Sequence, residues 1–136
     1  MASSNRYHKP KIHAVDLFCG AGGLTCGLKQ GGIKVKAGVD IETRCEYAYS
    51  HNNKAKFIAQ SVSELTGEDI ACFNANADYT LLAGCAPCQA FSTYNPKATS
   101  ADPRWHLLTE FGRLIEESKP DFVTMENVPW GLQWAS

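Results

Sequence analysis

The residues with the clearest chemical potential lie in the segment Gly84-Cys85-Ala86-Pro87-Cys88-Gln89, which follows an apolar run over residues 79–83. Such a run predicts a buried strand, and Pro87 fixes its own φ and biases Ala86 toward an extended backbone. Cys88 is then expected just beyond the carboxyl end of the strand, where open α/β sheets bind their ligands. Because a thiolate is a strong nucleophile near neutral pH, we interpret Cys88 as a candidate nucleophile.

Two other interpretations of Cys88 stay open at this point. Cysteine is among the most buried residue types, so the position also suits a small core residue. The C-x-x-C spacing of Cys85 and Cys88 is also typical of a zinc knuckle or a redox pair. A structural zinc site needs four ligands. No second C-x-x-C exists among the other cysteines, which are Cys19, Cys26, Cys45 and Cys72.

A second group of candidate residues belongs to a βαβ unit near the amino terminus. Residues 12–18 predict a strand, residues 19–23 a glycine-rich turn, residues 24–30 a helix, and residues 33–39 a second strand that ends at Asp40. Glycines let the backbone approach a ligand, the helix N-terminus offers free N–H groups, and a carboxylate can accept both ribose hydroxyls. This arrangement is typical of nucleoside binding.

The glycine turn departs from the dinucleotide fingerprint G-x-G-x-x-G. A match that starts at Gly20 requires glycine at position 25, where the chain has Thr25. The nicotinamide hypothesis is therefore weakened. A tight strand-to-helix connection with no ligand explains the same glycines, and Asp40 alone also suits a solvated strand end.

The later elements bring a second functional group to the same edge of the sheet. A helix is predicted to begin at Asp102-Pro103 and end near Ser118, and residues 121–125 predict another buried parallel strand that ends at Glu126. Sequential βαβ strands usually lie side by side, so we expect Glu126 and Cys88 to face one crevice. Between the second strand and the helix that begins at Asp102-Pro103, we predict a helix over 43–52, a strand over 56–59, a helix-like stretch over 63–73 and a mobile loop over 90–101. Within that last helix, the predicted core positions are Leu107, Leu108, Phe111, Leu114 and Ile115.

Composition favours one globular domain. The chain has 136 residues, of which 44% are hydrophobic and 20% charged, and its net charge is −1. That charge argues against strong electrostatic binding of nucleic acid by this chain alone. Residues 1–10 predict a disordered polar tail without a secretory h-region, and residues 11–136 a single folded unit. We therefore expect reduced thiols, a cytoplasmic location, and no membrane or metal partner.

Three motifs in order resemble a known family. The stretches Asp16-Leu17-Phe18-Cys19-Gly20-Ala21-Gly22-Gly23, Pro87-Cys88-Gln89 with Phe91-Ser92, and Met125-Glu126-Asn127-Val128 resemble the first, fourth and sixth motifs of the cytosine-C5 DNA methyltransferases. Asp102 and Arg104 with Leu107 resemble the intervening fifth motif. The resemblance spans Ile12 to Val128 and implies a partial, Rossmann-like α/β methyltransferase fold, a mostly parallel sheet of about five strands truncated on its C-terminal side.

The resemblance also implies roles for individual residues. Cys88 would be the nucleophile and Glu126 the active-site glutamate. At the third motif the family usually has Asp-Ile where this chain has Ser61-Val62, a departure at the customary carboxylate contact to adenine. The implied S-adenosylmethionine site comprises Asp16, Phe18, Gly20, Gly22, Gly23, Leu24, Asp40, Ile41, Val62, Pro87 and Leu107. The implied substrate contacts are Gln89, Ser92, Asn127 and Val128.

The implied reaction is methyl transfer to C5 of a flipped cytosine in double-stranded DNA, through a covalent bond between Cys88 and C6. The family continues past the sixth motif with a target-recognition domain and a last cofactor motif, which this chain lacks. We therefore expect the strand over 121–126 to have an uncovered edge and a half-bare apolar face. We also expect a fragment, completion by a C-terminal segment or subunit as in split members of the family, or self-association. Two alternatives remain: a tRNA cytosine-C5 methyltransferase, and a non-catalytic S-adenosylmethionine-binding module.

Overall fold

The architecture is an open, parallel five-stranded sheet with helices on both faces. The computed structural model describes residues 7–87 and 103–126, without the side chains of Pro103 and Arg104. The strands lie in the order β3-β2-β1-β4-β5, and every neighbouring pair is parallel. Their bounds are β1 (Ile12–Leu17), β2 (Lys34–Asp40), β3 (Lys56–Ala59), β4 (Tyr79–Gly84) and β5 (Phe122–Met125). The predicted fold class and all five strands are confirmed.

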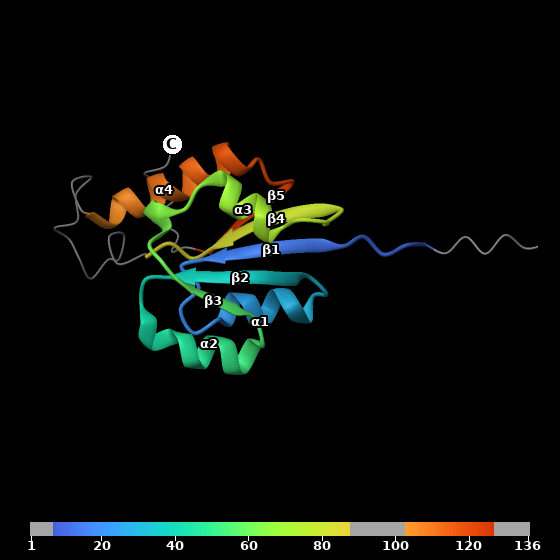
Figure 1. Cartoon of the computed structure of the whole chain (residues 1–136), viewed down its shortest axis with the longest axis horizontal. Coiled ribbons are helices and arrows are strands. Elements are labelled where there is room, and N and C mark those ends of the chain that lie inside the picture. Colours follow the sequence, from blue (N-terminus) through green and yellow to red (C-terminus); the bar gives the residue numbers. More distant parts are fainter. Residues whose placement is uncertain (1–6, 88–102, 127–136) are drawn as a thin grey trace, which may run out of the picture.

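The helices divide between the two faces of the sheet. Figure 1 shows α1 and α2 on one face and α3 and α4 on the other. Their bounds are α1 (Gly23–Gln30), α2 (Glu46–Asn53), α3 (Gly67–Phe73) and α4 (Pro103–Ser118), with 3-10 turns η1 (Thr43–Cys45) and η2 (Val62–Glu64). The chain runs from β1 outward to β3 and then crosses back to β4 on the other side of β1. The switch point between β1 and β4 is where open sheets of this kind bind ligands.

Two predicted helices are each split in two. The stretch over 63–73 consists of η2 followed by α3, because Thr66 and Asp69 form a capping box that starts a new helix at the next residue. The Thr66 side chain accepts from the backbone N–H of Asp69 at 3.2 Å, and Asp69 accepts from the backbone N–H of Thr66 at 2.9 Å. The predicted helix over 43–52 likewise begins as η1, capped by the Glu42 side chain, and continues as α2.

Apolar side chains fill the space on both faces of the sheet. On the α3/α4 face the core consists of Val15, Leu17, Val39, Val62, Leu65, Ile70, Leu82, Phe111 and Leu114. On the α1 face it consists of Ala14, Val35, Leu81 and Ala83. Of the five core positions predicted on α4, Phe111 and Leu114 are buried, whereas the other three are only half-buried. The face of α4 that is fully buried against the sheet is therefore narrower than predicted.

The last strand is exposed. β5 pairs with β4 as predicted, but Phe122 is 52% and Val123 45% exposed. The prediction of a buried strand is therefore wrong for these residues, whereas the expectation of an uncovered edge and a half-bare apolar face is confirmed for the described sheet. The reason is topological, because β5 is the outermost strand on its side of the described sheet. None of the described helices is long and apolar enough to cross a membrane.

Candidate functional site

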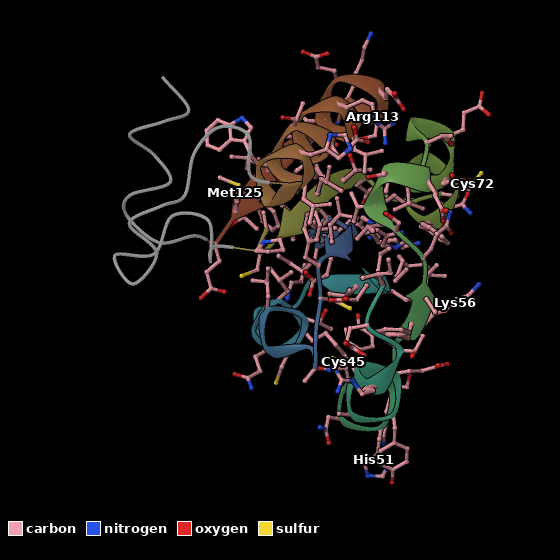
Figure 2. All side chains as sticks on the ribbon, turned by 90° about the vertical axis from the view of Figure 1, so that its left-hand side faces the viewer. Cys45, His51, Lys56, Cys72, Arg113 and Met125 are labelled. Carbon is pink, nitrogen blue, oxygen red and sulfur yellow. The ribbon has the colours of Figure 1, made fainter. Side chains whose placement is uncertain are left out.

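Strand register aligns the ends of four strands at one edge of the sheet. Leu17 pairs with both Val39 and Gly84, and Gly84 pairs in turn with Met125. Asp40, the last residue of β2, therefore lies level with the residues that directly follow β1, β4 and β5. Figure 2 looks onto this edge, with Arg113 on the side of α4, Cys45 on the side of α2, and Met125 at the β5 end. Among the described site residues, those of the glycine turn follow β1, Ile41 follows β2, Pro87 follows β4 and Glu126 follows β5, whereas Val62 lies in η2 after β3 and Leu107 lies in α4.

Backbone hydrogen bonds extend the sheet one step past the strand ends. The N–H of Cys19 donates to Val39 O at 3.1 Å, that of Cys85 to Leu17 O at 3.2 Å, and that of Glu126 to Gly84 O at 2.9 Å. Glu126 is therefore fixed by its backbone beside the end of β4, although its side chain is exposed. The expected adjacency of the two strands that lead to Cys88 and Glu126 is confirmed.

The glycine turn between β1 and α1 is tightly folded. Phe18 has φ 56°, Gly20 φ 50° and Gly22 φ 95°, so three residues adopt left-handed conformations within five positions. For Phe18 this conformation is strained, and such strain persists where the surroundings enforce it. Gly22 is the N-cap of α1 and supplies no side-chain cap. The backbone of Thr25 hydrogen-bonds Asp16, whereas the N–H groups of Gly23 and Leu24, the first two of α1, have no side-chain cap and suit a ligand.

Asp40 joins the glycine turn to the end of β2. Its Oδ2 accepts from the N–H of Gly20 at 2.8 Å, and its Oδ1 accepts from the N–H of Glu42 at 2.9 Å. Each carboxylate oxygen has a second lone pair, so Asp40 can still accept hydrogen bonds from a ligand. The half-exposed side chain thus has a structural role that the sequence did not reveal, and it remains able to fill its predicted role.

Asp16 lies fully buried at the end of β1. Its Oδ2 accepts from Thr25 Oγ1 at 2.6 Å, and its Oδ1 has no hydrogen-bond partner among the described residues. Burial raises the pKa of Asp16 to about 6, the hydrogen bonds from Thr25 oppose the rise, and the charges of Asp40 and Glu126 add to it. The charges of two neighbouring carboxylates therefore add to the effect of burial on Asp16. Within the described residues none of the three forms an ion pair with lysine or arginine.

The other predicted cofactor residues differ in exposure. Ile41 is 73% exposed, as an apolar surface for a flat ring requires. Val62 is 3% exposed and belongs to the core of the α3/α4 face, and Leu24 packs against the core of the α1 face. Pro87 and Leu107 are half-buried, and Gly23 is exposed at the start of α1. Cys88, Gln89, Ser92, Asn127, Val128 and the loop predicted over 90–101 lie outside the described residues.

Sequence reasoning missed the residues beneath the glycine turn. A Cβ on Gly22 would collide with Asn53 Nδ2 and the Tyr49 ring. Tyr49 is fully buried and its hydroxyl lies 3.0 Å from Thr25 Oγ1. In the sequence, Thr25 stands out only as the residue that breaks the dinucleotide fingerprint. The sequence feature that could have pointed to these residues is a polar residue, Thr25, shortly after Gly22-Gly23 on the side of α1 that faces the sheet.

Comparison with known proteins identifies the class. The family described as "C-5 cytosine-specific DNA methylase" matches residues 12–133. That range covers most of the chain, and the chain belongs to this family. The resemblance stated from the motifs is thereby confirmed.

Individual relatives give the extent of the match. The chain is 50% identical over 115 residues to the type II methylase M.HgiDII of Herpetosiphon aurantiacus, covering 85% of the chain and 32% of that protein. It is 35% identical over 117 residues to the type II methyltransferase M.XorII of Xanthomonas oryzae pv. oryzae, covering 84% and 27%. A crystal structure described as a prophage-encoded DNA modification methyltransferase of E. coli matches with a TM-score of 0.72 and 32% identity, covering 88% and 33%. The chain thus spans about a third of the length of these relatives.

Proposed function

We propose that this chain is the cofactor-binding and catalytic part of a DNA cytosine-C5 methyltransferase that uses S-adenosylmethionine. One observation carries the proposal: the parallel pairing of β4 with β5 brings Glu126 level with the strand end that leads to Pro87-Cys88. A nucleophile and a carboxyl group that act on one pyrimidine ring must approach it from neighbouring positions. The pairing of β4 with β5 supports such an arrangement.

The described residues fit the proposed cofactor. The unfilled N–H groups at the start of α1 suit the carboxylate of its amino-acid end. The carboxylates of Asp16 and Asp40 suit its positively charged and hydroxyl groups, and the buried Asp16 Oδ1 is an acceptor that the described protein leaves unfilled. Exposed Ile41, which follows Asp40, suits the adenine face. When bound, the cofactor supplies a methyl group on a sulfonium.

The proposed chemistry rests on Cys88 and Glu126. Carbon 5 of cytosine is a weak nucleophile, so addition of the Cys88 thiolate to C6 makes C5 electron-rich and able to accept the methyl group. The proton on C5 then leaves, the bond between sulfur and C6 breaks, and the ring is restored with the thiolate released. Glu126 would hydrogen-bond N3 and the exocyclic amine and so stabilise the charge that arrives with sulfur. A nearby carboxylate disfavours a thiolate, so we assign Glu126 to the base and not to cysteine activation.

The proposed substrate is a cytosine flipped out of double-stranded DNA, since Cys88 cannot reach C6 inside the stack. A further segment or subunit is proposed to complete the enzyme. Tyr79, the first residue of β4 and 44% exposed, and Phe122, the first residue of β5, lie at the amino ends of these strands, away from the site. Val123 is exposed on the other face of β5. The Tyr79 and Phe122 rings already pair at a centroid distance of 5.9 Å. Exposed apolar surface at a strand edge favours a covering element.

Covalent trapping tests the proposal. The chain, alone and fused to the remaining two thirds of M.HgiDII, is incubated with S-adenosylmethionine and a pool of randomised duplexes that contain 5-fluorocytosine. Fluorine cannot leave C5 as a cation, so an adduct that survives denaturation accumulates. We expect the adduct in the fusion protein, its loss in Cys88→Ser, and its strong reduction in Glu126→Gln.

The matched substrates decide between the alternatives. An equivalent pool of RNA strands is tested beside the DNA. Trapping on RNA alone would replace the DNA assignment with the tRNA-type activity. Binding of cofactor by the fusion protein without an adduct on either pool would leave a non-catalytic S-adenosylmethionine-binding module.

A further inference from the structure

A chain of two hydrogen bonds connects helix α2 to the carboxylate at the end of β1. The Tyr49 hydroxyl lies 3.0 Å from Thr25 Oγ1, and Thr25 Oγ1 lies 2.6 Å from Asp16 Oδ2. All three residues are 0% exposed. The three come from three different elements, α2, α1 and β1, which meet beneath the glycine turn.

The direction of this hydrogen-bond chain follows from the number of protons. An ionised carboxylate only accepts, and threonine has a single hydroxyl proton. Thr25 therefore donates to Asp16, and Tyr49 must donate to Thr25. Burial raises the pKa of Tyr49, which keeps its phenol protonated and able to donate. This series of hydrogen bonds ends at Asp16, whose second carboxylate oxygen is buried without a partner among the described residues.

Tyr49 also fixes the backbone around the turn. A Cβ on either Gly22 or Gly38 would collide with its ring, so the ring is wedged between the turn and β2. Its backbone carbonyl accepts from Asn53 Nδ2 at 3.1 Å. The Lys29 ammonium of α1 donates to the Asn53 carbonyl, which ties α1 to α2. Tyr49 thus holds the floor of the turn by packing and reaches Asp16 through its hydroxyl.

We propose that Tyr49 and Thr25 are positioning residues for the cofactor: their hydrogen bonds hold the Asp16 carboxylate so that its second oxygen accepts from a donor group of bound S-adenosylmethionine. This inference rests on the proposed function and assigns two residues to that same site. Neither residue needs to touch the cofactor. Each acts through Asp16 and the turn.

The charge of Asp16 makes the proposal testable by pH. The titratable groups around it are Asp40 at the end of β2, Glu126 after β5, Cys19 in the turn and Tyr49 on α2. The pKa of Asp16 is about 6, and the hydrogen bonds of Thr25 hold it below a still higher value. If the cofactor needs the ionised Asp16 carboxylate, its affinity increases as the pH rises through this pKa. Loss of the Thr25 hydroxyl raises the pKa of Asp16 further, so the increase in affinity occurs at higher pH.

The experiment is a calorimetric titration of the full chain with S-adenosylhomocysteine between pH 5 and pH 8.5. The variants are Tyr49→Phe, which keeps the ring, Thr25→Val, which keeps the shape, and Thr25→Ser, which restores the hydroxyl. At pH 7 we expect Thr25→Val to bind about tenfold more weakly, as loss of a hydrogen bond to a charged group implies. Tyr49→Phe should weaken binding about threefold. Thr25→Ser should bind like the wild type.

A merely structural role predicts another pattern. Thr25→Val would then lower the affinity by the same factor at every pH, and Thr25→Ser would not rescue it; either result overturns the inference. In an Asp16→Asn background, Thr25→Val should cause no further pH shift, and an unchanged shift would also contradict the inference. Circular dichroism checks that each variant is folded. Absence of binding by the wild-type chain would overturn the proposed cofactor site, and this inference with it.

Discussion

The two sides of the switch point are built differently. On the β1–β2–β3 side, the turn, α1 and α2 enclose a buried polar network, and Val39 and Tyr49 are fully buried. On the β4–β5 side, Phe122 and Val123 remain about half exposed. The proposed cofactor half, which comprises β1 to β3 with α1 and α2, is therefore packed by described residues. The proposed base half, which comprises β4 and β5, leaves apolar side chains exposed and needs a covering element.

Gly22→Ala gives the largest expected effect. The variant combines a left-handed φ of 95° with a collision against Asn53 and Tyr49. We expect the free energy of unfolding to fall by about 3 kcal/mol, from backbone strain and overpacking together. Gly20→Ala is the matched control, because Gly20 has φ 50° and no atom within 4 Å of an added Cβ. Gly20→Ala should lower the free energy of unfolding, measured by urea denaturation, by about 1 kcal/mol. Equal losses would show that the turn has no packed floor.

A pair of valines compares the two sides directly. Val39 is 0% and Val123 45% exposed. Val39→Ala should reduce the free energy of unfolding by about 2 kcal/mol, through lost burial and a residual cavity. Val123→Ala should reduce it by less than about 1 kcal/mol. Denaturation with urea measures both. A larger loss at Val123 would mean that the described chain covers β5 in solution.

Asp16→Asn sharpens the contrast by pH. The pKa of Asp16 is raised in the folded chain to about 6, above an unfolded value of about 3.9. The folded state therefore binds more protons between these values, so this group's contribution to stability falls as pH rises from about 4 to about 6. Asp16→Asn should remove that slope and stabilise the chain by about 2 kcal/mol at pH 7.5. Thermal unfolding across this range tests it. A variant that keeps the full slope would contradict the assignment.

Arg113 gives the smallest expected effect and tests how the loop before α3 is attached to α4. Its guanidinium donates to Leu65 O at 2.9 Å and to Glu117 at 2.9 Å. Lysine cannot reproduce this fork, so Arg113→Lys should cost about 1 kcal/mol in the free energy of unfolding. Arg44→Lys is the matched control, because among the residues that the structure describes Arg44 pairs with its near neighbour Glu42 on the surface. Arg44→Lys should leave the free energy of unfolding unchanged. Equal losses in the two variants would mean that Arg113 does not stabilise the contact between α4 and the loop before α3.

The sequence predicted the sheet well because its strands carry strong periodic signals. Apolar runs with glycine or proline at their ends located β1, β2, β4 and β5, and the parallel order followed from βαβ connectivity. The Asp16–Thr25–Tyr49 chain was not predictable from spacing. Its members are 9 and 24 residues apart and meet only because α1 and α2 pack on the same face.

Local polar contacts account for the other differences. The capping box of Thr66 and Asp69 restarts a helix that hydrophobic pattern alone extended. The exposure of Phe122 depends on what lies beside β5, which the composition of the strand does not encode. Predictions at Cys88 and its neighbours through Ser92, and at Asn127 and Val128, remain predictions because they lie outside the described residues.

Backbone hydrogen exchange, with and without saturating S-adenosylhomocysteine, tests whether the proposed cofactor half forms its site without further chain. If the cofactor half is already assembled, added ligand should slow exchange at residues 18–25 and 40–42 and leave 122–126 unchanged. No protection in a folded chain, or protection confined to β5, would contradict the claim that this half forms the cofactor site.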